Sequence, residues 1–265
     1  MKKLKSLVLV SLIVLLFSPS AFADEKAEEG WEFMLTPYLW AAGLNTTLGV
    51  GEVTVPVDWT VGDVFDKLKF AVPVTFNVKK DRWGAFAGYL YMNVGEDDVA
   101  VETPGPLPIS IAADYRYKIN MFELAGAYRI AGTREHGLEA FVGLRYSRNK
   151  MELDIRGGGP LQVQQGGDFE ESWTDLMLGF RYNAVFSSKW VMAVRGDIGF
   201  LSSSITINAM ANLGYRLSRT FDIFLGYRYL DINYENDKEG REYFKFAGHL
   251  NGFNLGINIR FGQRL

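Results

Sequence analysis

The sequence contains no cysteine, and only two of its 265 residues are histidine. The lack of cysteine excludes disulfides, so in an oxidising compartment the chain must be stabilised by backbone hydrogen bonding and packing. It also excludes thiolate metal sites, and the acidic residues lack the spacing of a calcium loop. The glycine run at 157–159 continues into Pro160 and Leu161 rather than a Lys-Ser/Thr pair, which excludes a phosphate-binding loop. We therefore expect no cofactor and no metal.

An excess of positive charge is also lacking. The chain has 28 basic and 31 acidic residues, a formal net charge of −3 and a pI near 5.6. This balance gives no case for nucleic acid as a partner.

Long apolar runs are absent beyond the N-terminus. Residues 1–23 have the pattern of a secretory signal peptide, with Lys2, Lys3 and Lys5 before an apolar stretch at 7–17 and a small-x-small site ending at Ala23. The apolar stretch is shorter than the ~20 residues of a spanning helix. We expect cleavage after Ala23, an acidic periplasmic tail at 24–30, and one domain at 31–265.

What the sequence does have is alternation with a period of two. In the last segment the odd positions from Phe253 to Phe261 are apolar, and the even positions between them are polar or glycine. No second apolar layer is evident elsewhere to cover such a face in a soluble sheet. Lipid covers the apolar outer face of a membrane barrel, and its polar side chains point inward. The pattern predicts an all-β chain that forms a transmembrane antiparallel up-and-down β-barrel.

The same alternation predicts about ten strands, although eight or twelve remain possible. Links after even-numbered strands are short, and those after odd-numbered strands are mostly longer, with loops expected at 44–66, 97–110 and 157–171. Short turns on one side and long loops on the other are typical of outer-membrane barrels. Within the first loop we expect a protruding hairpin at 46–57 and a short helical turn at 61–68. This turn either folds into the barrel mouth or, the alternative that we favour, caps the barrel. In the third strand we assign Phe86, Leu90, Met92 and Val94 to the outer face.

Aromatic residues cluster at strand ends next to the short turns, which predicts a girdle at one membrane interface. Its members are Trp31, Trp83, Trp190, Tyr128, Tyr182 and Tyr215.

The segments Gly226-Tyr227-Arg228-Tyr229-Leu230-Asp231 and Gly256-Ile257-Asn258-Ile259-Arg260-Phe261, with the signal peptide and alternating strands, resemble small outer-membrane β-barrel proteins of Gram-negative bacteria, the opacity-porin-like group. The resemblance covers most of the chain after the signal peptide. It implies location in the outer membrane, contact with its lipids and lipopolysaccharide, and insertion by the barrel-assembly machinery. Such proteins usually end on an aromatic residue, whereas four residues follow Phe261 here. We expect a monomer.

The inward face predicts a network of opposite charges that fills a narrow barrel. The assigned residues are Arg129, Arg145, Arg181, Arg195, Arg216, Arg228, Arg260, Glu123, Glu139, Asp175, Asp197 and Asp222. This favours a structural role, or a narrow pore in which the excess of arginine permits weak permeation of small anions.

An alternative is a hydrolase, either a protease or a lipid-modifying enzyme, with a site at the barrel rim. His249 and Asp231 are the candidate rim residues, although no serine nucleophile stands at a persuasive spacing. His136 lies in a predicted turn. The apolar positions of the last strand change from even (Phe244, Phe246, Leu250) to odd, which predicts either a bulge near residues 251–252 or a segment at 243–249 standing above the bilayer.

Overall fold

The structure, a computed structural model, describes residues 30–50, 53–102, 110–157 and 164–262. The predicted signal peptide and all of the predicted acidic tail except Gly30 lie outside these residues. Among the described residues, no helix is both long and apolar enough to cross a membrane.

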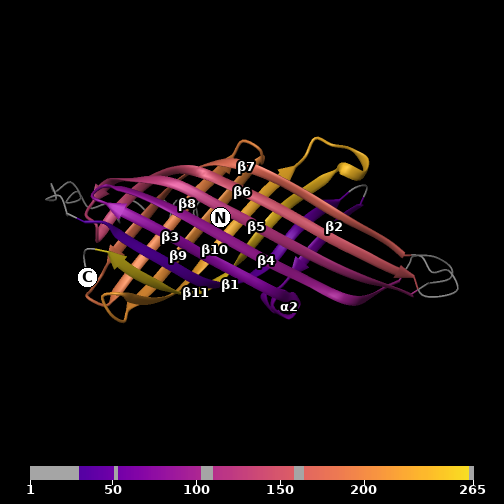
Figure 1. Cartoon of the computed structure of the whole chain (residues 1–265), viewed down its shortest axis with the longest axis horizontal. Coiled ribbons are helices and arrows are strands. Elements are labelled where there is room, and N and C mark those ends of the chain that lie inside the picture. Colours follow the sequence, from indigo (N-terminus) through magenta and orange to yellow (C-terminus); the bar gives the residue numbers. More distant parts are fainter. Residues whose placement is uncertain (1–29, 51–52, 103–109, 158–163, 263–265) are drawn as a thin grey trace, which may run out of the picture.

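Eleven strands form one antiparallel sheet (Figure 1). In chain order they are β1 (Glu32–Val50), β2 (Val53–Trp59), β3 (Leu68–Lys80), β4 (Trp83–Glu102), β5 (Ser110–Gly132), β6 (His136–Gly157), β7 (Gln164–Val185), β8 (Trp190–Phe200), β9 (Ile205–Arg216), β10 (Phe221–Glu235) and β11 (Phe244–Gly262). Two short helices, α2 (Val61–Lys67) and η2 (Gly240–Glu242), lie in the links.

Ten of these strands close into a barrel. From β3 to β11 each strand pairs with its neighbour in sequence, and β11 returns to β1 over the register Glu32↔Gly262 to Val50↔Phe244. The remaining strand, β2, pairs only with the far half of β1, as the hairpin arm predicted at 46–57. Closure leaves no free edge around most of the wall, which is what a barrel in lipid requires. The predicted ten-stranded up-and-down barrel is confirmed.

The outer face carries a broad band of exposed apolar side chains. Leu39, Leu124, Phe180, Leu225 and Phe253 are each more than half exposed. Their neighbours along each strand point inward and are buried or partly buried, because successive side chains of a strand face opposite sides. We call this band the lipid-facing belt, since water would make so much exposed apolar surface unfavourable.

The assignment for the third predicted strand is wrong. Phe86, Leu90, Met92 and Val94 are all buried inside the barrel, and the outward positions of β4 carry Tyr89 and Tyr91. Both faces of this strand are rich in large apolar groups, so alternation alone does not identify the side that meets lipid.

Several predicted loops are strand instead. β4 continues to Glu102 and β5 starts at Ser110, while β7 starts at Gln164, so little remains of the loops expected at 97–110 and 157–171. In Figure 1 the strands β4 to β7 reach furthest at the end of the barrel that carries these links. We call this the long-loop end, and the opposite end, with turns at 81–82, 133–135, 186–189 and 217–220, the short-turn end.

Of the two predicted causes of the parity change in the last strand, the bulge is wrong, and the segment at 243–249 standing above the bilayer stays a prediction. β11 pairs with both neighbours across residues 244–252 without a register shift, so there is no bulge. Phe244, Phe246 and Leu250 occupy the same inward face as Asn254, and all four are buried. The inward face itself changes from polar to apolar towards the long-loop end.

The wall has a break between β1 and β3. These strands pair only from Glu32↔Lys79 to Pro37↔Val74, and the pairing of β1 with β2 begins at Leu44↔Trp59. Residues 38–43 of β1 therefore have no strand partner on this side. Proline cannot donate to a ladder, and Pro37 stands where the pairing stops.

Helix α2 lies across this break on its long-loop side. Thr60 and Asp63 form a capping box at its start, and Val64 is buried inside the barrel. A helix of seven residues spans about 10 Å, roughly two strand spacings. The predicted helical turn is present, and it holds β1 and β3 apart at the long-loop side of the break.

Two glycines offer a matched test of wall packing. A Cβ on Gly252 of β11 would lie 1.7 Å from the carbonyl oxygen of Ala41, whereas one on Gly196 of β8 would meet nothing within 4 Å. We expect Gly252→Ala to lower the free energy of unfolding by about 1–3 kcal/mol through forced displacement of β1. Urea unfolding in lipid vesicles should show no comparable loss for Gly196→Ala. Equal stability of the two variants would contradict the close β1–β11 approach.

Candidate functional site: the layered barrel interior

Four charged side chains form a ring in the middle of the barrel. Arg145 Nη2 lies 2.7 Å from Glu123 Oε1 and 2.5 Å from Asp197 Oδ1. Arg195 completes the ring, with Nη1 2.9 Å from Glu123 Oε2 and Nε 2.8 Å from Asp197 Oδ2. The four formal charges cancel. We call these four residues the ionic layer.

The ionic layer is enclosed by uncharged groups that match its shape. Arg195 lies over the rings of both Phe86 and Phe141, at 4.9 and 5.2 Å. Asn208 Nδ2 donates to Asp197 Oδ2 at 2.7 Å. Cation–π contacts and charge-assisted hydrogen bonds are stronger at such buried positions than at an exposed surface.

A second ionic group lies nearer the short-turn end. Glu139 binds Lys79 Nζ at 2.6 Å and Arg181 Nη2 at 2.6 Å, and Arg181 Nη1 donates to Asn77. Sequence analysis did not assign Lys79 to the network. It is one of two adjacent lysines at a strand end, which reads as an ordinary solvated turn.

The short-turn end opens into a basic vestibule of about 370 Å³. Arg216 and Arg260 both face Asp222 there. The lining also includes Lys79, Arg134 and Arg219, against the carboxylates of Glu32, Glu135 and Asp222. Positive groups outnumber negative ones in this vestibule, which gives it the charge that attracts small anions.

Three residues of the predicted network lie elsewhere or bind other groups. Asp175 accepts from the backbone amides of Ser202 and Ser203, so it anchors the β8–β9 link rather than an arginine. Arg129 is buried near the short-turn end, where it donates to the carbonyl of Asp81. Arg228 forms no ion pair with a carboxylate anywhere in the described part of the chain; its partners are neutral.

Beyond the ionic layer, towards the long-loop end, the interior is apolar. We call this region the apolar layer; its side chains are at most 8% exposed. They come from β1, α2, β4, β5, β7, β10 and β11: Ala42, Leu44, Leu48, Val64, Leu90, Met92, Val94, Tyr117, Ile119, Met121, Trp173, Leu230, Ile232, Tyr234, Phe244, Phe246 and Leu250. This layer was not predicted from the sequence. The alternation of inward-facing positions along β10, extended to Leu230, Ile232 and Tyr234, would have revealed it.

The apolar layer is tied together where the wall is short. Strands β8 and β9 end early, and above them Trp173 of β7 stacks on Tyr234 of β10 with ring centroids 4.0 Å apart. Tyr234 also donates to Glu171 at 3.2 Å. Burial and the Glu171 carboxylate raise the pKa of Tyr234 to about 12, so the hydroxyl stays protonated and keeps this bond.

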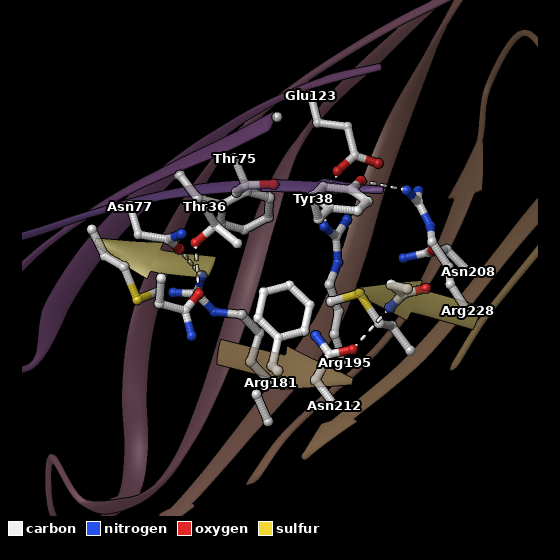
Figure 2. A pocket seen from close by; sticks show the side chains of 18 of the residues that line it. Thr36, Tyr38, Thr75, Asn77, Glu123, Arg181, Arg195, Asn208, Asn212 and Arg228 are labelled. Carbon is white, nitrogen blue, oxygen red and sulfur yellow. Dashed lines mark hydrogen bonds and ion pairs between the residues drawn. The ribbon is translucent and has the colours of Figure 1, made fainter. Parts of the chain in front are cut away.

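A smaller cavity of about 140 Å³ lies beside the ionic layer (Figure 2). It reaches the wall next to the break through Thr36 and Thr75, which pair with each other, and through Tyr38, the first unpaired residue of β1. Glu123, Arg195 and Arg228 also line it.

The six residues of the predicted girdle lie at the short-turn end. Trp31, Trp83, Trp190 and Tyr128 are exposed, and Tyr182 and Tyr215 are partly so. Trp83 meets Tyr128 edge-on at 4.8 Å, and Trp190 meets Tyr215 edge-on at 5.1 Å. These paired rings border the lipid-facing belt.

The rim candidates lie on the outside of the wall. His249 and Asp231 are directly paired between β11 and β10, and both belong to the outward face. Asp231 accepts hydrogen bonds from Tyr229 and Asn233, while His249 stacks on Tyr229 at 5.4 Å. Neither side chain points into the barrel.

No protein-family profile matches the sequence, and no curated protein matches it either. Solved structures do match. The outer-membrane protease OmpT from Escherichia coli is 8% identical, with 90% of this chain and 99% of that chain covered and a TM-score of 0.50. The translocator domain of the autotransporter NalP from Neisseria meningitidis is 11% identical over 98% of both chains, with a TM-score of 0.43. The likeness to OmpT shows the fold, and at that level the predicted resemblance to Gram-negative outer-membrane barrels is confirmed.

Proposed function

We propose that this protein is an integral outer-membrane barrel with a filled interior and a structural role in the cell envelope. The proposal rests on the two buried layers of side chains, the ionic layer and the apolar layer, which lie one after the other across the barrel. Arg145 of the ionic layer and Phe246 of the apolar layer are at most 1% exposed. A barrel of this size has room for side chains to fill it, and here they do so with the paired charges of the ionic layer and the packed rings of the apolar layer.

The location is tested by heat-modifiable migration and fractionation. Folded barrels resist unfolding by detergent at room temperature, because their hydrogen-bonded wall is closed. We expect a band that shifts on boiling and sediments with outer membranes. An unshifted band in the soluble periplasm would contradict the proposal.

A second candidate function is weak permeation of small anions through a narrow path, which would depend on the basic vestibule. A narrow path for anions is supported by the excess of arginine around Asp222. Liposome swelling should therefore show slow entry of chloride and little entry of sugars. Faster entry of sugars than of anions would exclude a role for the vestibule in selection.

A rim hydrolase is the alternative function, and the outward placement of His249 and Asp231 argues against that particular pair as its centre. A general base must reach the group whose proton it takes, and Asp231 already accepts from Tyr229 and Asn233. We expect His249→Ala to leave the lipid A profile and peptide cleavage by whole cells unchanged. Loss of either hydrolysis with the barrel still folded would establish a catalytic role for His249.

The surroundings of the barrel follow from its outer face. We propose that lipid tails cover the belt and that lipopolysaccharide head groups meet the charged outer face above it. Arg148 and Lys150 project from β6 there, ion-paired with Glu170, Glu152 and Asp168. That the protein is a monomer, and that the barrel-assembly machinery inserts it, remain predictions.

A further inference from the structure

We propose that the break between β1 and β3 is a binding site for a single-chain amphiphilic acid, whose carboxylate contacts Arg228 and whose apolar chain extends into the membrane. This ligand-binding role goes beyond the structural role proposed above and does not depend on conductance through the barrel.

The first observation is the break itself. Residues 38–43 of β1 lack a strand partner on the β3 side, and 68–73 of β3 pair only with β4. The outward side chains at these edges, Leu39 and Val72, are exposed in the belt. Open sheet edges facing hydrocarbon are strongly unfavourable, because their backbone groups find no hydrogen-bonding partner. The break therefore marks the part of the wall where the two strands are not held together and where an apolar chain could pass between them into lipid.

The second observation is Arg228. It is 5% exposed, and none of the described carboxylates pairs with it. Its Nε donates to Asn208 Oδ1 at 2.9 Å, its Nη1 donates to the Tyr38 hydroxyl at 3.1 Å, and the guanidinium lies 4.7 Å from the Trp40 ring. A buried cation without a counter-charge is costly, and an anionic ligand would offset that cost.

The break and Arg228 meet at the same cavity. Tyr38 is both the first unpaired residue of β1 and a hydrogen-bond partner of Arg228, as Figure 2 shows. Glu123, the carboxylate lining this cavity, is bound to Arg145 and Arg195 and interacts with Arg228 without forming an ion pair with it. The positive charge of Arg228 therefore remains available to a ligand.

The size of the cavity defines the class of ligand. Its volume of about 140 Å³ is well below the ~300–1,000 Å³ of pockets that enclose a whole small molecule. It has room for a carboxylate and the first carbons of a chain. The rest of the chain would pass between β1 and β3 beneath α2, along Leu39 and Val72, into lipid.

The test is binding of palmitic acid to the purified full-length protein in nonionic detergent. We expect saturable binding at one site per chain, with methyl palmitate and acetate binding much more weakly. Arg228→Met should weaken palmitate binding by at least about tenfold, the effect of losing a hydrogen-bonded charge. Arg148→Met, at an exposed ion pair outside the barrel, is the matched control and should bind as the wild type does.

Photolabelling of the wild-type protein keeps the test independent of whether Arg228→Met folds. A diazirine analogue of palmitic acid should label residues 38–43 and 68–73 preferentially, and excess palmitate should suppress that labelling. Uniform labelling around the belt, unchanged affinity in folded Arg228→Met, or equal binding of the methyl ester would each overturn the proposal.

Discussion

Replacing Arg145 by Met is expected to lower the free energy of unfolding by about 3–5 kcal/mol, because it leaves buried carboxylates with too little positive charge. Glu123 and Asp197 both contact Arg145, which is fully buried. Arg195 stays bound to both carboxylates, so one negative charge remains uncompensated. Unfolding by urea in lipid vesicles measures the loss.

Two further variants separate charge from packing at this site. Arg145→Met combined with Glu123→Gln removes one charge of each sign, and we expect it to recover part of the lost stability. Arg148→Met removes an arginine whose side chain is half exposed and bound to Glu170; such pairs contribute about 0–1 kcal/mol. If Arg145→Met costs no more than Arg148→Met, the ionic layer does not stabilise the barrel.

Replacing Trp173 by Ala is expected to cost about 3–5 kcal/mol, the range for loss of a large buried aromatic side chain. Trp173 is 4% exposed and stacks on Tyr234, a side-chain contact that joins β7 to β10 beyond the ends of the shorter strands β8 and β9. The variant would leave a cavity in the apolar layer with no strand behind it. The same unfolding measurement, with the temperature of heat-modifiable migration as a second readout, tests this.

The matched control for Trp173 is Trp83, which is 69% exposed on the outer face. Trp83→Ala removes the same side chain from the girdle without opening a cavity, so we expect a clearly smaller loss. Equal losses in the two variants would show that the aromatic residues act mainly through the membrane interface and not by filling the barrel.

Strand alternation was enough to predict the barrel, its strand number and the inward position of Arg145, Glu123 and Asp197. A period of two has one physical cause, the opposite direction of successive side chains, so it carries from sequence to structure directly. It failed at β4, where Phe86 and Tyr89 give both faces large apolar groups. Alternation also failed beyond the belt. Lipid does not require an apolar outer face there, so the sequence of a strand such as β7 looks like that of a loop.

The wall break could not be predicted from the sequence. It depends on which residues of β1 meet β3 and which meet β2, and alternation does not specify pairing between strands. Pairing of β1 with β3 stops at Pro37, which cannot donate to a ladder, but a proline by itself does not show how far the unpaired stretch extends. The two neutral hydrogen-bond partners of Arg228, Tyr38 and Asn208, likewise come from strands distant in sequence.

Single-channel recording of the purified wild-type protein in planar bilayers tests the filled interior most directly. With the ionic and apolar layers both in place, we expect no conductance steps or only small, brief ones in potassium chloride. Large and stable steps of the size given by general porins would mean that water and ions pass freely through the barrel, and would contradict a filled interior.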